Sequence, residues 1–318
     1  MNEMDGMLVS VVIPCFNVRS FVGRTLQSLL AQDHADWEAI LVDDGSTDGT
    51  DAVITACTDP RLRLVRQANQ GVSAARNRGI DLASGRALLF LDADDWLAPE
   101  ALARMVARLD GSAAIATYGP FCFVTEDGSR VVQTKAGPFP EGDIIERLLV
   151  ENLFANGGHM LIRTQAIAAI GRFRADLRFG EDWEYWCRLA LHGALSVVPG
   201  QAPLLFVRQR SSGAYLRMAT NPEAFTPCIQ AIFGNPDLIR RVDPVLLARL
   251  RRATEAETDW IVGRELIRHG SLGSGLARLR RSAKRRFSIK RAVLLVVAHL
   301  SPVLPTRLTG PFRRYRTP

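Results

Sequence analysis

Short apolar runs alternate with amphipathic stretches through the first third of the chain. Each apolar run is rich in large or β-branched residues and is bounded by turn-forming residues, which predicts a buried strand. The runs are Leu8–Pro14, Trp37–Val42, Leu62–Arg66 and Ala87–Leu91. Helical spacing of apolar residues follows each run, at Arg19–Gln32, Asp48–Cys57, Val72–Ala83 and Pro99–Leu109. This alternation predicts a mostly parallel sheet covered by helices on both faces.

Beyond Leu109 the pattern changes twice. Residues 113–142 are irregular and β-like, with a turn expected at 126–128. Helices are predicted next, at Asp143–Glu151, Gln165–Ile170 and Asp182–His192. Residues 222–282 carry helical spacing throughout. We therefore expect a first domain over residues 1–218 and, over residues 219–318, a helical extension with a basic and partly apolar tail.

The composition narrows the class of protein. The chain has 318 residues, 47% of them hydrophobic and 23% charged, which excludes a disordered, collagenous or disulfide-rich protein. Its five cysteines form no CxxC pair, which favours reduced thiols in the cytoplasm. The polar start of the chain lacks the apolar core of a signal peptide, and no apolar run has the ~20 residues of a spanning helix.

The net charge of +7 is unevenly distributed along the chain. Residues 266–318 contain thirteen Lys or Arg and no acid, so the rest of the chain is mildly acidic. A basic block, Arg278–Arg291, precedes a mostly apolar stretch, Ala292–Leu304, that is too short to span a bilayer. This order favours a tail that lies on an anionic membrane surface at the inner face of the cell membrane. A packed helix with a solvated basic face is one alternative. Nucleic acid is disfavoured, because Phe287 is the only aromatic residue in the basic block.

Carboxylates follow the predicted strands, where ligands of open α/β sheets bind. The turn after the first strand has no GxGxxG, and no GxxxxGK[ST] occurs in the chain, so the usual dinucleotide and P-loop sites are excluded. Asp44 follows the second strand, where its carboxylate can accept the imide N–H of a pyrimidine or belong to a capped turn. Asp92 and Asp94 follow the fourth strand, and such a pair suits a divalent cation on a diphosphate. Asp95 can instead begin the next helix.

Two helical segments add charged groups. The run NQGVSAARNRG places Arg76 on a helical turn after a glycine, where the guanidinium can reach a diphosphate or lie on a solvated face. The run FGEDWEYWCR opens with Glu181 and Asp182. These acids can stabilise the helix start through its dipole. Alternatively, Asp182 can act as a general base toward an acceptor hydroxyl.

Taken in order, five segments resemble the inverting family 2 glycosyltransferases over residues 7–215: VVIPCFN, VDDGSTDGT, NQGVSAARNRG, FLDADD and GEDWEYW. The resemblance implies a GT-A fold, which has a Rossmann-like, mostly parallel sheet flanked by helices. It also implies that Pro14 and Asn17 border the nucleotide pocket and that Asp44 contacts a uracil-type base.

The resemblance further implies a role for each charged group. Asp92 is expected near the ribose, Asp94 on a Mg²⁺ or Mn²⁺ ion bound to the diphosphate, and Arg76 near the phosphates. Asp182 is expected to be the catalytic base, with Glu181 beside it on the substrate side. The reaction would be one in-line displacement with inversion at the anomeric carbon.

The resemblance leaves some positions open. His159, in GGHMLIR, is a candidate for the acceptor side, although a lone histidine is more often structural. Many family members carry a basic or histidine-containing loop that holds the diphosphate, and here Gln209 stands where histidine is frequent. Arg208 or Arg210 can replace it, and the sequence does not choose between them. Residues after about 220 match no family motif.

These observations lead to one hypothesis and one alternative. The hypothesis is a metal-dependent glycosyltransferase that moves a sugar from a nucleotide-sugar, expected to be UDP-linked, to a hydroxyl of a glycan or lipid-linked acceptor in surface polysaccharide synthesis. The alternative is a catalytically inactive protein of the same fold that binds a nucleotide-sugar or an anionic surface. A nucleotidyltransferase is disfavoured because the glycine-rich N-terminal loop is missing.

Overall fold

The computed structural model describes residues 6–210 and 223–300. The chain forms two compact units, one from Met1–Ile145 with Leu153–Gln209 and one from Glu146–Asn152 with Arg210–Pro318. The expected boundary between residues 218 and 219 lies outside the described residues. A short excursion of the chain, Glu146–Asn152, belongs to the second unit, and this was not predicted from the sequence.

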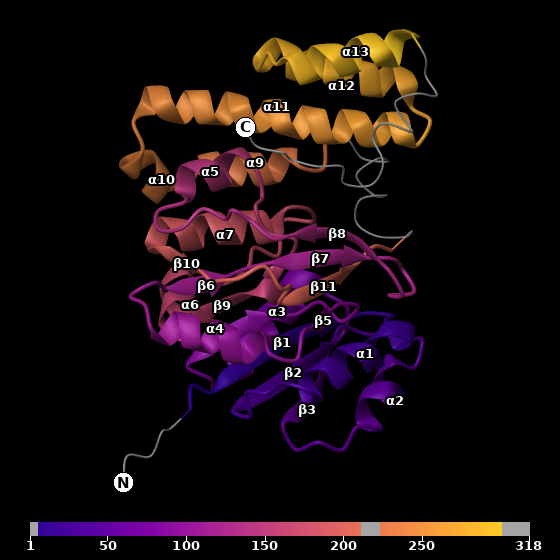
Figure 1. Cartoon of the computed structure of the whole chain (residues 1–318), viewed down its shortest axis with the longest axis vertical. Helices are drawn as coiled ribbons and strands as arrows, with labels where there is room; N and C mark the ends of the chain where they lie inside the picture. Colours follow the sequence, from indigo (N-terminus) through magenta and orange to yellow (C-terminus); the bar gives the residue numbers. More distant parts are fainter. Residues whose placement is uncertain (1–5, 211–222, 301–318) are drawn as a thin grey trace. The chain divides into compact units, whose positions relative to one another are not determined.

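A seven-stranded sheet forms the centre of the first unit (Figure 1). In spatial order its strands are β10 (Leu195–Val197), β6 (Ala116–Tyr118), β9 (Met160–Arg163), β4 (Ala87–Phe90), β1 (Val9–Cys15), β2 (Trp37–Asp43) and β3 (Leu62–Arg66). Strands β4, β1, β2 and β3 are parallel, whereas β9 runs antiparallel to β4 and β6. The expected mostly parallel sheet is therefore confirmed, with one antiparallel strand inserted into it.

The pairing register sets which residues meet at the carboxyl edge of this sheet. Cys15 pairs with Asp43, and Val12 pairs with Phe90. The loops after β1, β2 and β4 therefore leave the sheet side by side. Every residue of β4 is buried, and β1 and β2 each have a single residue that is not fully buried. This burial explains why these strands read as almost continuous apolar runs.

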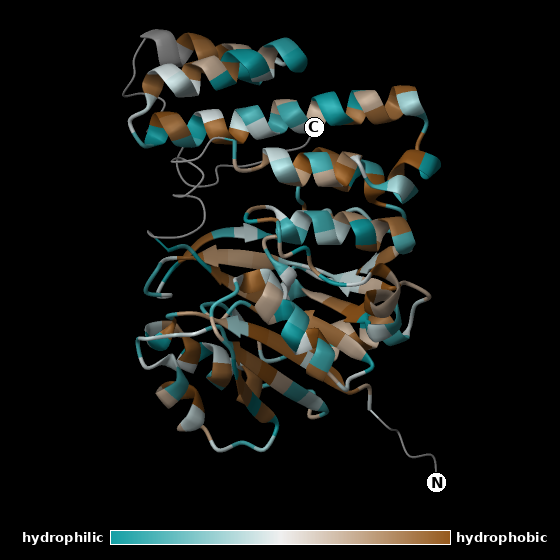
Figure 2. Cartoon of the chain, turned by 180° about the vertical axis from the view of Figure 1, so that it is seen from behind, coloured by the Kyte–Doolittle hydropathy of each residue, from teal (hydrophilic) through white to brown (hydrophobic). Residues whose placement is uncertain are grey.

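The helices predicted in this unit are present, with shifted ends. They are α1 (Arg19–Leu30), α2 (Thr50–Thr55), α3 (Val72–Leu82), α4 (Ala101–Asp110), α6 (Thr164–Ile170) and α7 (Glu181–His192). Figure 2 shows brown, apolar strands between helices that alternate brown and teal along their length. Helix α2 begins two residues later than expected, because the Asp48 carboxylate accepts the Thr50 backbone N–H at 3.0 Å and Gly49 has a φ of 84°. Asp48 and Gly49 thus precede the first residue of α2 and are not part of the helix.

A smaller four-stranded sheet completes the first unit. Its strands, in spatial order, are β5 (Trp96–Leu97), β11 (Leu205–Arg208), β7 (Phe121–Val124) and β8 (Val131–Lys135). The β7–β8 hairpin contains the turn expected at residues 126–128, where Gly128 has a φ of 72°. This sheet matters for the site because β11 returns the chain to the loop that follows β4.

The second unit is helical over its described residues. It contains α5 (Ile145–Val150), α9 (Thr226–Phe233), α10 (Pro236–Arg241), α11 (Pro244–Arg268), α12 (Leu272–Arg285) and α13 (Ile289–Leu300). The side chains of Trp260, Ile267 and Leu279 form a buried cluster. Helices α11 and α12 are so close at Gly275 that a Cβ atom added there would lie 2.7 Å from the Gly263 carbonyl oxygen. Among residues 6–210 and 223–300, no helix is long and apolar enough to cross a membrane.

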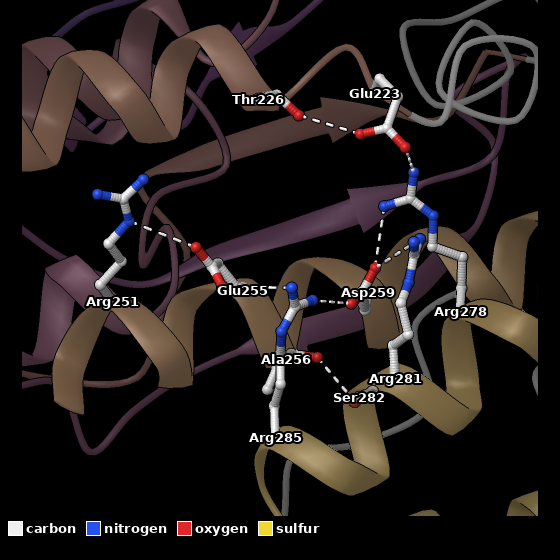
Figure 3. Close-up of polar contacts among 10 residues, drawn as sticks. All are labelled: Glu223, Thr226, Arg251, Glu255, Ala256, Asp259, Arg278, Arg281, Ser282 and Arg285. Atoms are coloured by element: carbon white, nitrogen blue, oxygen red, sulfur yellow. Dashed lines mark hydrogen bonds and ion pairs between the residues drawn. The ribbon is translucent and has the colours of Figure 1, made fainter. Parts of the chain in front are cut away.

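Ion pairs join α12 to α11 (Figure 3), and a further pair joins α13 to α11. The Asp259 carboxylate is 2% exposed and is paired with Arg278, Arg281 and Arg285. Glu257 is likewise paired with arginines that follow in the sequence, Arg286 and Arg291. Much of the basic block is therefore neutralised within its own unit.

Candidate active site at the carboxyl edge of the sheet

The loop after β1 is fastened to the loop after β2. Asn17 has a φ of 51°, a left-handed conformation that asparagine tolerates better than most residues. Its side-chain oxygen accepts the Thr47 N–H at 2.9 Å, and its own N–H donates to the Ser46 hydroxyl at 3.0 Å. Pro14 lies three residues earlier, inside β1, and is partly exposed. Pro14 and Asn17 thus share the rim formed by these two loops.

Asp44 is a buried acceptor at the end of β2. Its side chain is 3% exposed and accepts the backbone N–H groups of Gln70 and Gly71 at 2.9 and 2.8 Å. The amide of Gln67 donates a third bond at 2.8 Å. These bonds hold the loop before α3 against the end of β2. The expected contact of Asp44 with a base remains a prediction.

The loop after β4 is held in place by Asp95. This carboxyl group is 2% exposed and accepts the Arg208 backbone N–H at 2.7 Å and the side-chain amide of Asn156. Burial and the nearby charges of Asp92 and Asp94 raise the pKa of Asp95 well above its usual range. The alternative in which Asp95 begins the next helix is wrong, because α4 starts at Ala101 and its cap position is Glu100.

Arg208 supports the same loop from β11. Its Nε donates to the Asp94 backbone oxygen at 2.9 Å, and its Nη1 donates to the Glu126 carbonyl. Its guanidinium also lies 5.0 Å from the Trp96 ring centroid. Two of the three nitrogens of this guanidinium therefore bond backbone carbonyls. The choice between Arg208 and Arg210 as a phosphate contact remains a prediction.

Arg76 joins the loop after β4 to the start of α7. Its Nη2 lies 3.1 Å from an oxygen of Asp92, and its Nη1 lies 3.0 Å from an oxygen of Glu181. The residue is 5% exposed, and its guanidinium lies 5.3 Å from the Phe173 ring centroid. The sequence suggested a phosphate contact, and the structure adds two carboxylate partners. Their charges raise the pKa of Arg76 against the effect of burial.

Asp182 stands beside this ion-paired group. Gly180, with a φ of 72°, lets the chain turn into α7, and one Asp182 oxygen accepts the Trp183 N–H at 2.7 Å. Burial and the neighbouring Glu181 carboxylate together raise the pKa of Asp182 to about 7, although the charge of Arg76 acts to lower it. A carboxyl group that titrates near neutral pH suits a general base. Burial is the largest of the effects on this carboxyl group.

His159 lies in the interior of the first unit. Its side chain is 0% exposed, and Nδ1–H donates to the Gly119 carbonyl oxygen at 2.9 Å. Rings of Phe121 and Phe154 surround it, and burial lowers its pKa to about 4. This is the packing of a core histidine. The expected place of His159 on the acceptor side remains a prediction.

The residues can hold a divalent cation only together with a ligand. Within the part of the chain that the structure describes, no group of three His, Cys, Asp or Glu side chains converges on one point. Mg²⁺, however, is commonly held by one or two carboxylates together with substrate phosphates and water. Asp92 and Asp94 are both partly exposed at the end of β4, so they fit that donor set.

Asn156 and Phe173 were not predicted from the sequence, and Arg208 was predicted only as a candidate phosphate contact, not as a support of this site. Asn156, Phe173 and Arg208 come from segments far from the strand ends in sequence, and they reach the site through β11 and the loops before β9 and α7. In the sequence, the one indication of a buried supporting residue was Asp95, the second aspartate of the Asp94–Asp95 pair. The partners of that carboxylate are tertiary and carry no local pattern.

Comparisons with known proteins agree with this geometry. Residues 10–171 match the model of glycosyl transferase family 2. The succinoglycan biosynthesis protein ExoO of Rhizobium meliloti is 31% identical over 223 residues, which cover 66% of this chain and 64% of ExoO. The teichuronic acid biosynthesis glycosyltransferase TuaG of Bacillus subtilis, whose assignment is itself provisional, is 36% identical over 126 residues, or 38% of this chain and 50% of TuaG. The matched part thus spans less than two thirds of each relative.

Solved structures share the fold over nearly the whole chain. TarS 1–349 of S. aureus, in complex with UDP, has a TM-score of 0.63 at 17% identity and covers 98% of this chain and 94% of its own. The mannosyltransferase PcManGT of Pyrobaculum calidifontis, in complex with GDP-Man and Mn²⁺, has a TM-score of 0.59 at 18% identity and covers 98% and 89%. At 17% and 18% identity, this similarity supports the fold alone.

Proposed function

Because the chain belongs to glycosyl transferase family 2, with the GT-A fold of its structural neighbours, we propose that it moves a sugar from a nucleotide-sugar to a hydroxyl group of a glycan or lipid-linked acceptor. The observation that supports this most is the group formed by Asp92, Arg76 and Glu181. Arg76 bonds both carboxylates, so the strand-end acids and the start of α7 meet at one place. Asp182, with its raised pKa, lies at the same helix start.

In this proposal Asp182 removes the proton of the acceptor hydroxyl. A carboxyl with a pKa of about 7 is ionised in a large fraction of molecules at neutral pH and is a stronger base than an ordinary aspartate. The hydroxyl oxygen then attacks the anomeric carbon from the side opposite the diphosphate, which inverts the configuration. Arg76 pairs with both Glu181 and Asp92, so its charge offsets the repulsion between these two carboxylates.

The nucleotide would lie along the carboxyl edge of β1 and β2. Pro14 and Asn17 form the rim. Asp44 accepts the imide N–H of a uracil-type base through Oδ2, which accepts the Gly71 N–H and keeps a second lone pair. A UDP-sugar is the donor we propose. The neighbours TarS and PcManGT were solved with UDP and with GDP-Man, which supports a nucleotide-sugar without choosing the base.

Asp94 would hold Mg²⁺ or Mn²⁺ on the diphosphate, with Asp92 near the ribose. When bound, the cation neutralises negative charge on the departing nucleoside diphosphate. Arg208 and Asp95 keep the loop that carries Asp94 in one position, through the bonds to its backbone oxygen and to Asn156. The Mn²⁺ in the PcManGT complex supports the use of a divalent cation.

We place the reaction in the synthesis of a surface polysaccharide, at the inner face of the cell membrane. The names of ExoO and TuaG support the class of product. Residues 301–318, which contain four Arg and no acid, support contact with anionic lipid. A lipid-linked acceptor would explain both features, because such a substrate stays in the membrane.

The test measures release of nucleoside diphosphate from a panel of UDP- and GDP-sugars, with Mn²⁺ or Mg²⁺ and with EDTA. We expect release that requires metal and is abolished by Asp94→Ala and by Asp182→Asn. The matched control is Asp176→Asn, because the side chain of Asp176 is 63% exposed and is paired with Arg174. Thermal stabilisation by UDP with no turnover on any acceptor would contradict the proposal and favour a binding protein of the same fold.

A further inference from the structure

Helix α3 carries a side-chain amide that bonds two backbone groups of a distant loop. Asn77 follows Arg76 on α3, and its Nδ2 donates to the Phe173 carbonyl oxygen at 2.9 Å. Its Oδ1 accepts the Phe173 backbone N–H at 2.8 Å. Both ends of the amide thus bond one residue, 96 positions further along the chain. This pair of hydrogen bonds fixes the direction of the loop backbone as well as its position, because it engages a donor and an acceptor of the same residue.

Phe173 lies in the loop that joins α6 to α7. Residues 171–180 contain no helix or strand, so this loop has no hydrogen-bonded ladder of its own. On the side of α7, Arg188 donates to the Arg172 carbonyl oxygen at 2.8 Å. On the side of α3, the amide of Asn77 holds the next residue. The start of the loop is therefore fixed between the two helices that carry Arg76 and Asp182.

The ring of Phe173 lies where three elements of the site meet. It stacks on the Tyr185 ring of α7, with the ring centroids 3.8 Å apart and an interplanar angle of 7°. The Phe90 ring, at the end of β4, meets it edge-on at a centroid distance of 5.0 Å. The guanidinium of Arg76, on α3, lies 5.3 Å from its centroid. Phe173 is 3% exposed, so close packing on β4, α3 and α7 determines where its ring lies.

The same three elements carry the charged groups of the site. Asp92 follows β4, Arg76 lies on α3, and Asp182 lies in the first turn of α7. Tyr185 stands three residues after Asp182, so the two side chains are neighbours along one side of that helix. A shift of the Phe173 ring would displace Tyr185, and with it the first turn of α7, relative to the other two elements.

We propose that Asn77 is a positioning residue for the transfer reaction. Through the backbone and the ring of Phe173 it fixes the first turn of α7, and with it Asp182. The inference rests on the proposed function and gives Asn77 no contact with substrate or metal. Both ends of its amide bond the protein itself, so its effect on the reaction is one of geometry. Such effects are large, since misplacing a reacting group by ~1 Å can lower a rate roughly 100-fold.

Kinetics of the full chain test this role. The assay is Mn²⁺-dependent release of nucleoside diphosphate from the panel of UDP- and GDP-sugars, and UDP with Mn²⁺ is the binding probe in calorimetry. We expect Asn77→Ala to lower kcat at least about tenfold and to leave the Kd for UDP within about twofold of wild type. Phe173→Leu, which removes the stacked ring and keeps the backbone bonds to Asn77, should give the same pattern. The double variant should lose no more than the larger single loss, because the two residues act in series.

Two control variants separate positioning from the mere loss of contacts. Arg172→Gln removes the exposed ion pair between the same loop and Asp81 of α3, and kcat should stay within about twofold of wild type. Asn235→Ala removes an amide that also makes two bonds to backbone, from the N–H groups of Asp237 and Leu238 in the second unit. Its melting temperature shows what the loss of two such bonds costs, and its kcat should equal that of wild type.

Each outcome decides a different point. Wild-type protein that turns over no donor overturns the proposed function and this inference together. Turnover by wild type with an unchanged kcat in Asn77→Ala overturns the inference alone. A Kd for UDP that rises about tenfold in Asn77→Ala assigns the amide to the nucleotide and also overturns it. Losses that add in the double variant show that Asn77 does not act through Phe173, with the same consequence.

Hydrogen exchange keeps the inference testable if a variant does not fold. In the unmodified protein the Phe173 amide should exchange more slowly than the amides of its loop neighbours, because its N–H is bonded to Asn77. In folded Asn77→Ala, exchange should become faster at Phe173 and in α7 and stay unchanged in α1. A wild-type Phe173 amide that exchanges as fast as its neighbours would overturn the inference without any substitution.

Discussion

The pH dependence of transfer is the sharpest consequence of the site. Asp182 has a pKa raised to about 7, first by burial and then by the charge of Glu181. An aspartate with its ordinary pKa of 3.8 is fully ionised from pH 6 upward, so it would give a flat profile there. If Asp182 is the base, kcat/KM must rise with pH across neutrality, because only the ionised carboxylate accepts the acceptor proton.

The magnitude follows from the titration of one group. With an apparent pKa of about 7 for the Asp182–Glu181 pair, about a tenth of the molecules carry the ionised base at pH 6 and about nine tenths at pH 8. We therefore expect kcat/KM to increase roughly tenfold between these two pH values. The assay is initial-rate release of nucleoside diphosphate in overlapping buffers of constant ionic strength, with stability checked at each pH.

A charge substitution separates Asp182 from other titrating groups. Arg76 lowers the pKa of Asp182, so Arg76→Gln is expected to move the acidic limb of the profile to higher pH. The control is Arg172→Gln, which removes an exposed cation paired with Asp81 and leaves the limb in place. A profile that stays flat down to pH 5, or a limb that Arg76→Gln does not move, would refute the assignment of Asp182 as the base.

Three further predictions concern stability. Asp182→Asn should abolish transfer and stabilise the ligand-free protein by roughly 2 kcal/mol at pH 8, with no gain at pH 3. The wild-type carboxylate destabilises the folded protein increasingly as pH rises from 3.8 to about 7, because its pKa is raised in the folded state. Urea unfolding at both pH values measures this difference. Asp95→Ala should cost about 2 kcal/mol, because the Arg208 N–H loses a buried acceptor, and a melt that equals wild type would speak against that support. Asp259→Asn should cost about 3 kcal/mol, because it leaves the buried guanidinium of Arg278 without its carboxylate partner, whereas Arg251→Gln, at an exposed pair, should cost under about 1 kcal/mol in the same unfolding assay.

Much of the first unit was predictable because its signals are local. The strand at Leu62–Arg66 was predicted with the bounds it has, and the helix expected at Asp182–His192 begins one residue earlier. Period and turn chemistry are properties of neighbouring residues, so a single sequence carries them. The order of the acids along the chain was equally visible. Because parallel strands end at one edge, it also predicted that Asp44, Asp92 and Asp94 follow strands of that edge.

The chain alone could not tell what holds those acids. Arg76 and Glu181 are 105 residues apart, and Asp95 and Arg208 are 113 residues apart. Neither pair has a local pattern, since each forms only when β4, α3, α7 and β11 pack together. The protonation of Asp182 belongs to the same class, because burial is its largest cause and burial exists only in the folded chain.

For the basic tail, too, the sequence determined some features and the tertiary structure determined others. The sequence by itself determined that residues 266–318 carry thirteen cations and no acid, and that a short apolar stretch lies among them. Only the tertiary structure decided that Asp259 and Glu257 of α11 pair with five of those arginines and that Ile289, Val293 and Val296 face outward. Composition counts charges wherever they are, whereas an ion pair or an exposed stripe depends on which helix faces touch.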